Sequence, residues 1–310
     1  MTLAYLPRLI CLTLACFFLV NILMTVVVAV FSRRAIRKAD RFPPRKAASF
    51  ILGLRLVPVG LAAFAAIGLC VPSYMWFEPE RVEEHVGFFC LALAFSGLAI
   101  LGVATTRALR AVVESLIFFR RCRHSGNMRD DLGALVIASS RPLIALAGVV
   151  RPRLIMSQGI VDALNGEELA VVMVHERAHR ESRDNLKRLC MTIAPGFASL
   201  DRAWVRLAEF AADEQAVAGD EKRALALASA LVRVARVGQN PGTPRYAISF
   251  LGNACDLSDR VDRLLAPRPF AASARPRTTP LWISVVCLAA ISFNPFTLRW
   301  VQSALEELLH

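Results

Sequence analysis

Four long runs of apolar residues dominate the hydropathy pattern of the chain. They extend from about Leu9 to Phe31, Phe50 to Val71, Val86 to Ala104 and Leu281 to Val301. Because a helix rises about 1.5 Å per residue, about 20 apolar residues cross the roughly 30 Å hydrocarbon layer of a bilayer. The pattern therefore predicts four transmembrane helices.

The runs differ in how clearly they predict a span. The first is too long for the apolar part of a signal peptide, and further spans follow it. The second contains Arg55 near one end, where a long side chain can reach the membrane surface. The fourth is interrupted by Asn294-Pro295 after a shorter apolar core, Leu281 to Phe293. For this run a buried or interfacial helix remains an alternative to a span.

The charges between the runs predict how the chain is oriented. The first loop is strongly basic, with Arg33, Arg34, Arg37, Lys38, Arg41, Arg45 and Lys46 against Asp40. The second is acidic, with Glu78, Glu80, Glu83 and Glu84 against Arg81. Basic residues follow the third run at Arg107, Arg110, Arg120, Arg121 and Arg123. Since basic loops stay in the cytoplasm, we expect both termini outside and residues 106–280 inside.

Composition fits this interpretation. The chain has 310 residues, 55% of them hydrophobic, which is too apolar for an ordinary soluble domain. Its net charge of +12 lies mainly in the loops, so the charge reflects membrane topology, and we expect contact with membrane lipid but no direct nucleic-acid binding. We therefore expect a multi-pass protein of the inner (plasma) membrane.

The region between the third and fourth runs has a mixed pattern. Short apolar runs bounded by turn residues predict strands at Gly133–Ser139, Leu143–Val149 and Leu154–Met156. Asn165 and Glu168 form a capping-box pattern that opens a helix with an apolar stripe. Further helices are predicted at about Asp201–Ala218, Glu221–Val237 and Leu257–Leu265.

The predicted helix after Asn165 contains an HExxH motif, formed by His175, Glu176 and His179. Two histidines four residues apart share one helix face and can bind one Zn²⁺, while Glu176 activates the attacking water. A surface helix with two solvated histidines is the alternative, but the preceding Val171–Val174 run is apolar. Arg177 is unusual within such a motif, and at this position it can point away from the metal.

A catalytic zinc site needs a third protein ligand. The only later histidine, His310, is expected across the membrane, so the ligand should be a carboxylate. Glu209 and Asp213 share a face of the next helix, and we expect Glu209 to bind the metal while Asp213 accepts a hydrogen bond from a ligating imidazole. Glu214 is the alternative ligand. The pattern predicts one Zn²⁺ per chain.

These motifs resemble the gluzincin membrane peptidases, and more closely the BlaR/MecR-type antirepressor peptidases. The segments that carry the resemblance are Arg151–Ile155, Asn165–Leu169, His175–Asn185 and Leu257–Leu265, together with the layout of spans. The resemblance implies zinc held by His175, His179 and Glu209, Glu176 as base, and a structural role near the site for Asp184.

The expected fold is a mostly α membrane protein with a cytoplasmic α+β gluzincin-like domain. Residues 1–105 hold three spans, residues 106–280 form the zinc metallopeptidase domain, and residues 281–310 hold the fourth span and a short outer tail. Signalling members of the family carry an outer sensor domain after the fourth span, which we do not expect here, because the chain stops at His310.

The expected activity is zinc-dependent endopeptidase cleavage of protein substrates on the cytoplasmic side. One setting is signal transduction, in which the substrate is a transcriptional repressor. Constitutive quality control of membrane proteins is a second setting. A non-catalytic membrane sensor or scaffold that retains the zinc fold is a third hypothesis, although such a protein should lack catalytic residues that are present here.

Overall fold

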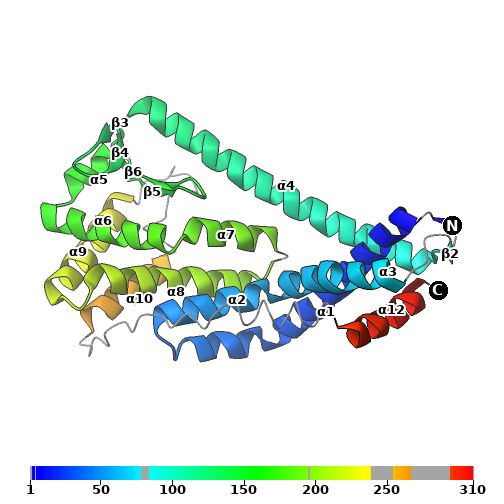
Figure 1. The fold of residues 1–310 in the computed structure, drawn as a ribbon. Coiled ribbons are helices and arrows are strands. Elements are labelled where there is room, and N and C mark those ends of the chain that lie inside the picture. The colour runs from blue at the N-terminus through cyan, green and yellow to red at the C-terminus, as the bar shows by residue number, and fades with distance from the viewer. Residues whose placement is uncertain are drawn as a thin grey trace.

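The computed structural model describes residues 2–3, 5–77, 84–194, 196–238, 254–266 and 294–309. Within these ranges the protein is mostly helical, with a four-stranded sheet beside the helices at the end far from the chain termini (Figure 1). Long N-terminal helices form one end of the molecule, and shorter helices pack beside the sheet at the other.

Three long helical segments coincide with the first three predicted spans. They are α1 (Tyr5–Ala39), the segment Pro44–Phe77 and α4 (Phe88–Ser125), and each is long and apolar enough to cross a membrane. Pro44–Phe77 comprises α2 (Pro44–Ala63), the π-helical η1 (Phe64–Cys70) and α3 (Val71–Phe77). Less than a third of each apolar window is buried, which leaves large apolar side chains free to contact lipid.

The fourth predicted span is described only in part. Its apolar core, residues 281–293, lies outside the described residues. The remainder belongs to α12 (Pro295–Leu309), which packs against α3, where Ser73 Oγ donates a 2.7 Å hydrogen bond to the Leu298 carbonyl. At the same end, β1 (Thr2–Leu3) pairs with β2 (Glu84–His85), and α12 also contacts α1 (Figure 1).

The sheet contains the three predicted strands and one that was not predicted. Its order is β3 (Gly126–Arg129), β4 (Ala134–Ile137), β6 (Arg153–Ser157) and β5 (Ile144–Ala147). β4 and β6 are parallel, whereas β3 and β5 pair antiparallel with their neighbours. β5 is consequently an edge strand. β3 has no buried side chain and no apolar alternation, which is why its sequence gives no strand signal.

In the described part of the chain, the remaining helices are α5 (Gln158–Ala163), α6 (Gly166–Glu181), α7 (Asp184–Ile193), α8 (Ala198–Val217), α9 (Glu221–Gly238) and α10 (Ala254–Leu265). The predicted capping box of α6 is confirmed: Glu168 N–H donates to Asn165 Oδ1 at 2.8 Å, and Asn165 N–H donates to Glu168 Oε2 at 3.0 Å. The cap fixes where the HExxH helix begins.

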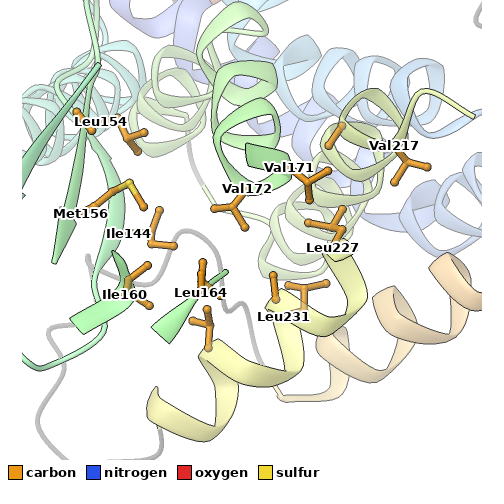
Figure 2. Close-up of a cluster of buried hydrophobic side chains, with 14 of the residues drawn as sticks. Ile144, Leu154, Met156, Ile160, Leu164, Val171, Val172, Val217, Leu227 and Leu231 are labelled. Atoms are coloured by element: carbon orange, nitrogen blue, oxygen red, sulfur yellow. The ribbon is translucent and has the colours of Figure 1, made fainter. Parts of the chain in front are cut away.

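An apolar core fixes the rotation of α6. Figure 2 shows Val171 and Val172 of α6 among side chains from the sheet, α5 and α9, including Ile144, Met156 and Leu227. Residues four apart share a helix face, so Val171, His175 and His179 lie on the same face of α6. Burial of Val171 therefore turns both histidines toward the protein interior.

A second core joins the membrane helices to α8. Ala47 and Ile51 of α2 pack with Trp204 and Leu207 of α8. Within this contact, Arg55 of α2 is 1% exposed, and it reaches the protein interior instead of the membrane surface expected from sequence.

Arg55 connects α2 to the junction of α7 and α8. Its Nε donates to Asp201 Oδ1 at 2.7 Å, and one terminal nitrogen donates to the carbonyls of Met191 and Ala194 at 3.0 and 3.2 Å. These carbonyls end α7, where helix geometry leaves oxygens without intrahelical donors. The guanidinium thus satisfies the end of one helix and the first turn of the next.

We expect Arg55→Met to lower the free energy of unfolding by about 2 kcal/mol, because it strips charged donors from two carbonyls at a buried site. Thermal unfolding of the detergent-solubilised protein measures the change. Arg45→Met is the control, since Arg45 is exposed on the same helix. Equal melting temperatures for the two variants would show that the Arg55 contacts contribute nothing to stability.

Candidate metal centre

The two histidines of the motif lie side by side inside the protein. His175 and His179 are 0% and 3% exposed, and their Nε2 atoms are 3.1 Å apart. Each Nδ1 faces a carboxylate: His175 Nδ1 lies 3.0 Å from Asp213 Oδ1, and His179 Nδ1 lies 2.7 Å from Asp184 Oδ2. A proton held on Nδ1 by these carboxylates leaves the lone pair of Nε2 available for a metal.

Glu209 of α8 completes a group of three potential ligands. Its Oε2 lies 3.5 Å from His175 Nε2 and 3.6 Å from His179 Nε2. Ligands about 2.1 Å from a tetrahedral zinc ion lie roughly 3.3–3.5 Å from one another. The three separations of 3.1, 3.5 and 3.6 Å therefore match one face of such a tetrahedron, and two imidazoles with a carboxylate are a donor set suited to zinc.

Neighbouring charges shift the pKa values of the histidine and glutamate side chains at the centre. Burial lowers the pKa of His179, but the charge of Glu209 and the hydrogen bond to Asp184 outweigh it and raise this pKa to about 10. Burial raises the pKa of Glu209, but His179 and Arg260 outweigh it, so this pKa lies well below its ordinary value. Such concentrated negative charge around two imidazoles is an environment that favours a cation.

Glu176 lies beside the three potential ligands but is not one of them. The side chain is 1% exposed, and neither carboxylate oxygen has a hydrogen-bond partner among the described residues. Burial raises the pKa of Glu176, since the charged form loses its hydration. An unpartnered buried carboxylate beside a potential metal site is suited to exchange protons with a bound water or substrate.

The other predicted residues are placed as follows. Glu214, the alternative ligand, points away, is 42% exposed on its side chain and contacts Arg263 at 2.6 Å. The structure thus brings Glu209, not Glu214, to the histidines. Arg177 is exposed on the far side of α6, where it cannot obstruct the site.

Sequence reasoning missed Arg260 of α10. This side chain is 2% exposed, donates to both Asp213 oxygens at 2.8 and 2.6 Å, and lies 3.1 Å from Glu209 Oε2. Arg260 therefore holds the carboxylates of α8 in position against their mutual repulsion. A signal was available: Arg260 lies in the segment Leu257–Leu265, which was predicted as a helix and is one of the segments that carry the family resemblance.

Comparison with known proteins identifies the family. The sequence model of Peptidase family M48 matches residues 104–268, which is more than half of the 310 residues and includes every side chain of the centre. The chain belongs to peptidase family M48. No curated protein and no solved structure matches it.

Membership of family M48 makes the protein a metallopeptidase, and this family is metal-dependent, usually using zinc. Together with the three apolar helices, it describes a membrane-associated metallopeptidase. The match supports the M48 family but not specifically the BlaR/MecR type that the sequence resembles.

Proposed function

We propose that this M48 protein is an integral membrane zinc endopeptidase that hydrolyses protein substrates on the cytoplasmic side. The observation that carries the proposal is the tetrahedral spacing of His175, His179 and Glu209, with the unpartnered carboxylate of Glu176 beside them. A non-catalytic scaffold has no need of a buried, unpaired base, whose burial is costly.

The reaction is hydrolysis of a peptide bond. A zinc ion held by His175, His179 and Glu209 would act as a Lewis acid and increase the acidity of the attacking water. Glu176 accepts a proton from this water as the oxygen attacks the carbonyl carbon, and it then delivers the proton to the leaving nitrogen as the C–N bond breaks. Asp213 and Asp184 keep the imidazoles in the required tautomer and orientation.

Strand β5 offers a means of holding an extended substrate. It lies at the sheet edge, and Asn185, the neighbour of Asp184, donates to the carbonyls of Leu146 and Gly148 at 2.9 and 2.7 Å. These bonds place the end of β5 next to the metal centre. A peptide strand added along the free part of this edge would pass close to the centre.

The cytoplasmic orientation is inferred from the basic loops, and it places both termini outside. The substrate is a protein, and the residues similar to the antirepressor peptidases favour a transcriptional repressor, cleaved after a signal. Constitutive cleavage of damaged membrane proteins is the competing setting. The two settings are distinguished by sequencing the protein fragments that accumulate only with active enzyme. Cleavage of a repressor yields one defined cut, whereas removal of damaged membrane proteins yields cuts in many proteins.

The proposal is tested with protein reconstituted in sealed vesicles. We expect about one zinc per chain, cleavage of an added unfolded protein by vesicles with the residue 106–280 region outward, loss of cleavage with 1,10-phenanthroline and recovery with zinc. Vesicles of the opposite orientation are the control. Cleavage that survives complete zinc removal would exclude a zinc peptidase, and cleavage only by the opposite vesicles would exclude the cytoplasmic orientation.

A further inference from the structure

The positively charged side chains around the metal centre differ in whether they already form hydrogen bonds with carboxylates. Among the described residues, Arg260 places its guanidinium on Asp213 and Glu209, and Lys187 donates to Asp184 at 2.9 Å. Both therefore neutralise carboxylates that hold the histidines and Glu209. Both side chains are thus already paired with carboxylates of the centre.

Arg188 of α7 is different. Its nearest carboxylate oxygen, Glu209 Oε1, is 3.8 Å away, which is beyond hydrogen-bonding distance. Its Nε is buried and has no partner among the described residues, while the side chain as a whole is 39% exposed. A buried N–H without an acceptor is unfavourable, so the position favours an incoming acceptor.

The position of Arg188 on α7 and its approach to Trp204 show where its guanidinium lies. Its stem is carried on the face of α7 that also carries Asp184, the hydrogen-bond partner of His179. Its guanidinium lies 6.0 Å from the ring centre of Trp204 on α8, a residue that is 1% exposed. Arg188 thus stands between α7 and α8, beside Glu209, with part of its side chain open to solvent.

We propose that Arg188 binds the carbonyl oxygen of the scissile peptide bond and stabilises the negative charge that develops on it. The inference rests on the proposed peptidase function and deepens it. The guanidinium stays protonated, so it contributes hydrogen bonds and charge without transferring a proton. Arg188 makes no hydrogen bond to Glu209 at 3.8 Å, and its Nε has no partner among the described residues. Donors that engage only as charge develops raise kcat more than they lower KM.

The test compares wild type, Arg188→Ala and Arg188→Lys, with Arg202→Ala as control because Arg202 is exposed on α8. We expect Arg188→Ala to lower kcat about 100-fold with little change in KM, and Arg188→Lys to recover part of the loss. A phosphinic peptide, whose tetrahedral phosphinate replaces the scissile amide, should lose affinity for Arg188→Ala by a similar factor. The uncleaved parent peptide, measured in the Glu176→Gln background, should keep its affinity within about threefold.

Zinc content and melting temperature are measured for every variant, and all affinities are compared at saturating zinc. Equal phosphinate affinity in wild type and Arg188→Ala overturns the proposal, as does an equal loss for the parent peptide, which indicates ordinary substrate binding. If Arg188→Ala is unstable, Arg188→Gln is measured in its place under the same criteria. A wild type that binds zinc but cleaves nothing contradicts the proposed function itself, whereas normal cleavage by Arg188→Ala contradicts only the role of Arg188.

Discussion

Replacing Glu176 with glutamine should abolish peptide hydrolysis while leaving zinc in place. Glutamine keeps the size of the side chain but cannot accept the proton of the attacking water, and general-base catalysis contributes about 10²–10⁴-fold to the rate. Because Glu176 is not among the three grouped ligands, its loss should not lower the zinc content. Initial rates and zinc content of the same preparation measure both effects.

Glu167→Gln is the matched control for this variant. Glu167 lies on the same helix and is exposed, so the substitution makes the same change of charge without reaching the centre. It should cleave at the wild-type rate. Wild-type cleavage by Glu176→Gln would remove Glu176 from the mechanism, and loss of zinc from this variant would make it a ligand.

Replacing Glu209 with glutamine should weaken zinc binding by more than about 100-fold. Groups that only support a ligand cost 10–100-fold in metal affinity when removed, so a ligand itself should cost at least the upper part of that range. The amide also leaves Arg260 facing a neutral group where it now lies 3.1 Å from a carboxylate oxygen. Competition with a chromophoric chelator measures the affinity.

Glu214→Gln distinguishes the two ligands that the sequence left open. Glu214 is on the same helix as Glu209 but contacts Arg263 at the surface. We expect this variant to bind zinc as wild type does. If Glu214→Gln instead loses zinc and Glu209→Gln retains it, the ligand assignment made from the geometry is wrong.

The features best predicted from sequence were those set by local spacing. His175, Glu176 and His179 lie within one turn of one helix, so the motif alone places them together. The capping box of α6 is equally local, and the three N-terminal apolar runs needed only length and hydropathy. Asp213 could be associated with the site because it lies one helical turn after Glu209.

Features that depend on the meeting of distant segments were not predictable in this way. Arg260 reaches Asp213 across 47 residues, and only the docking of α10 against α8 brings them together. Arg55 looked like a membrane-surface residue because nothing local indicates Asp201, which lies 146 residues later. α7 was not predicted as a separate helix because only two residues separate it from α6, and the left-handed one, Arg183 with φ of 55°, is not a glycine that would mark a helix end.

The Arg55 hydrogen bonds between α2 and the α7–α8 junction affect which substrates can come to the metal centre. A domain on a flexible tether can move over a large volume, but Arg55 and the surrounding core join α8 to α2, which begins a segment long and apolar enough to cross a membrane. α1 alone, with 35 residues, extends about 52 Å, some 20 Å more than the hydrocarbon layer. We therefore expect the metal centre to lie at a fixed distance from the membrane surface. Whether a peptide bond is cleaved should then depend on how far that bond lies from the lipid.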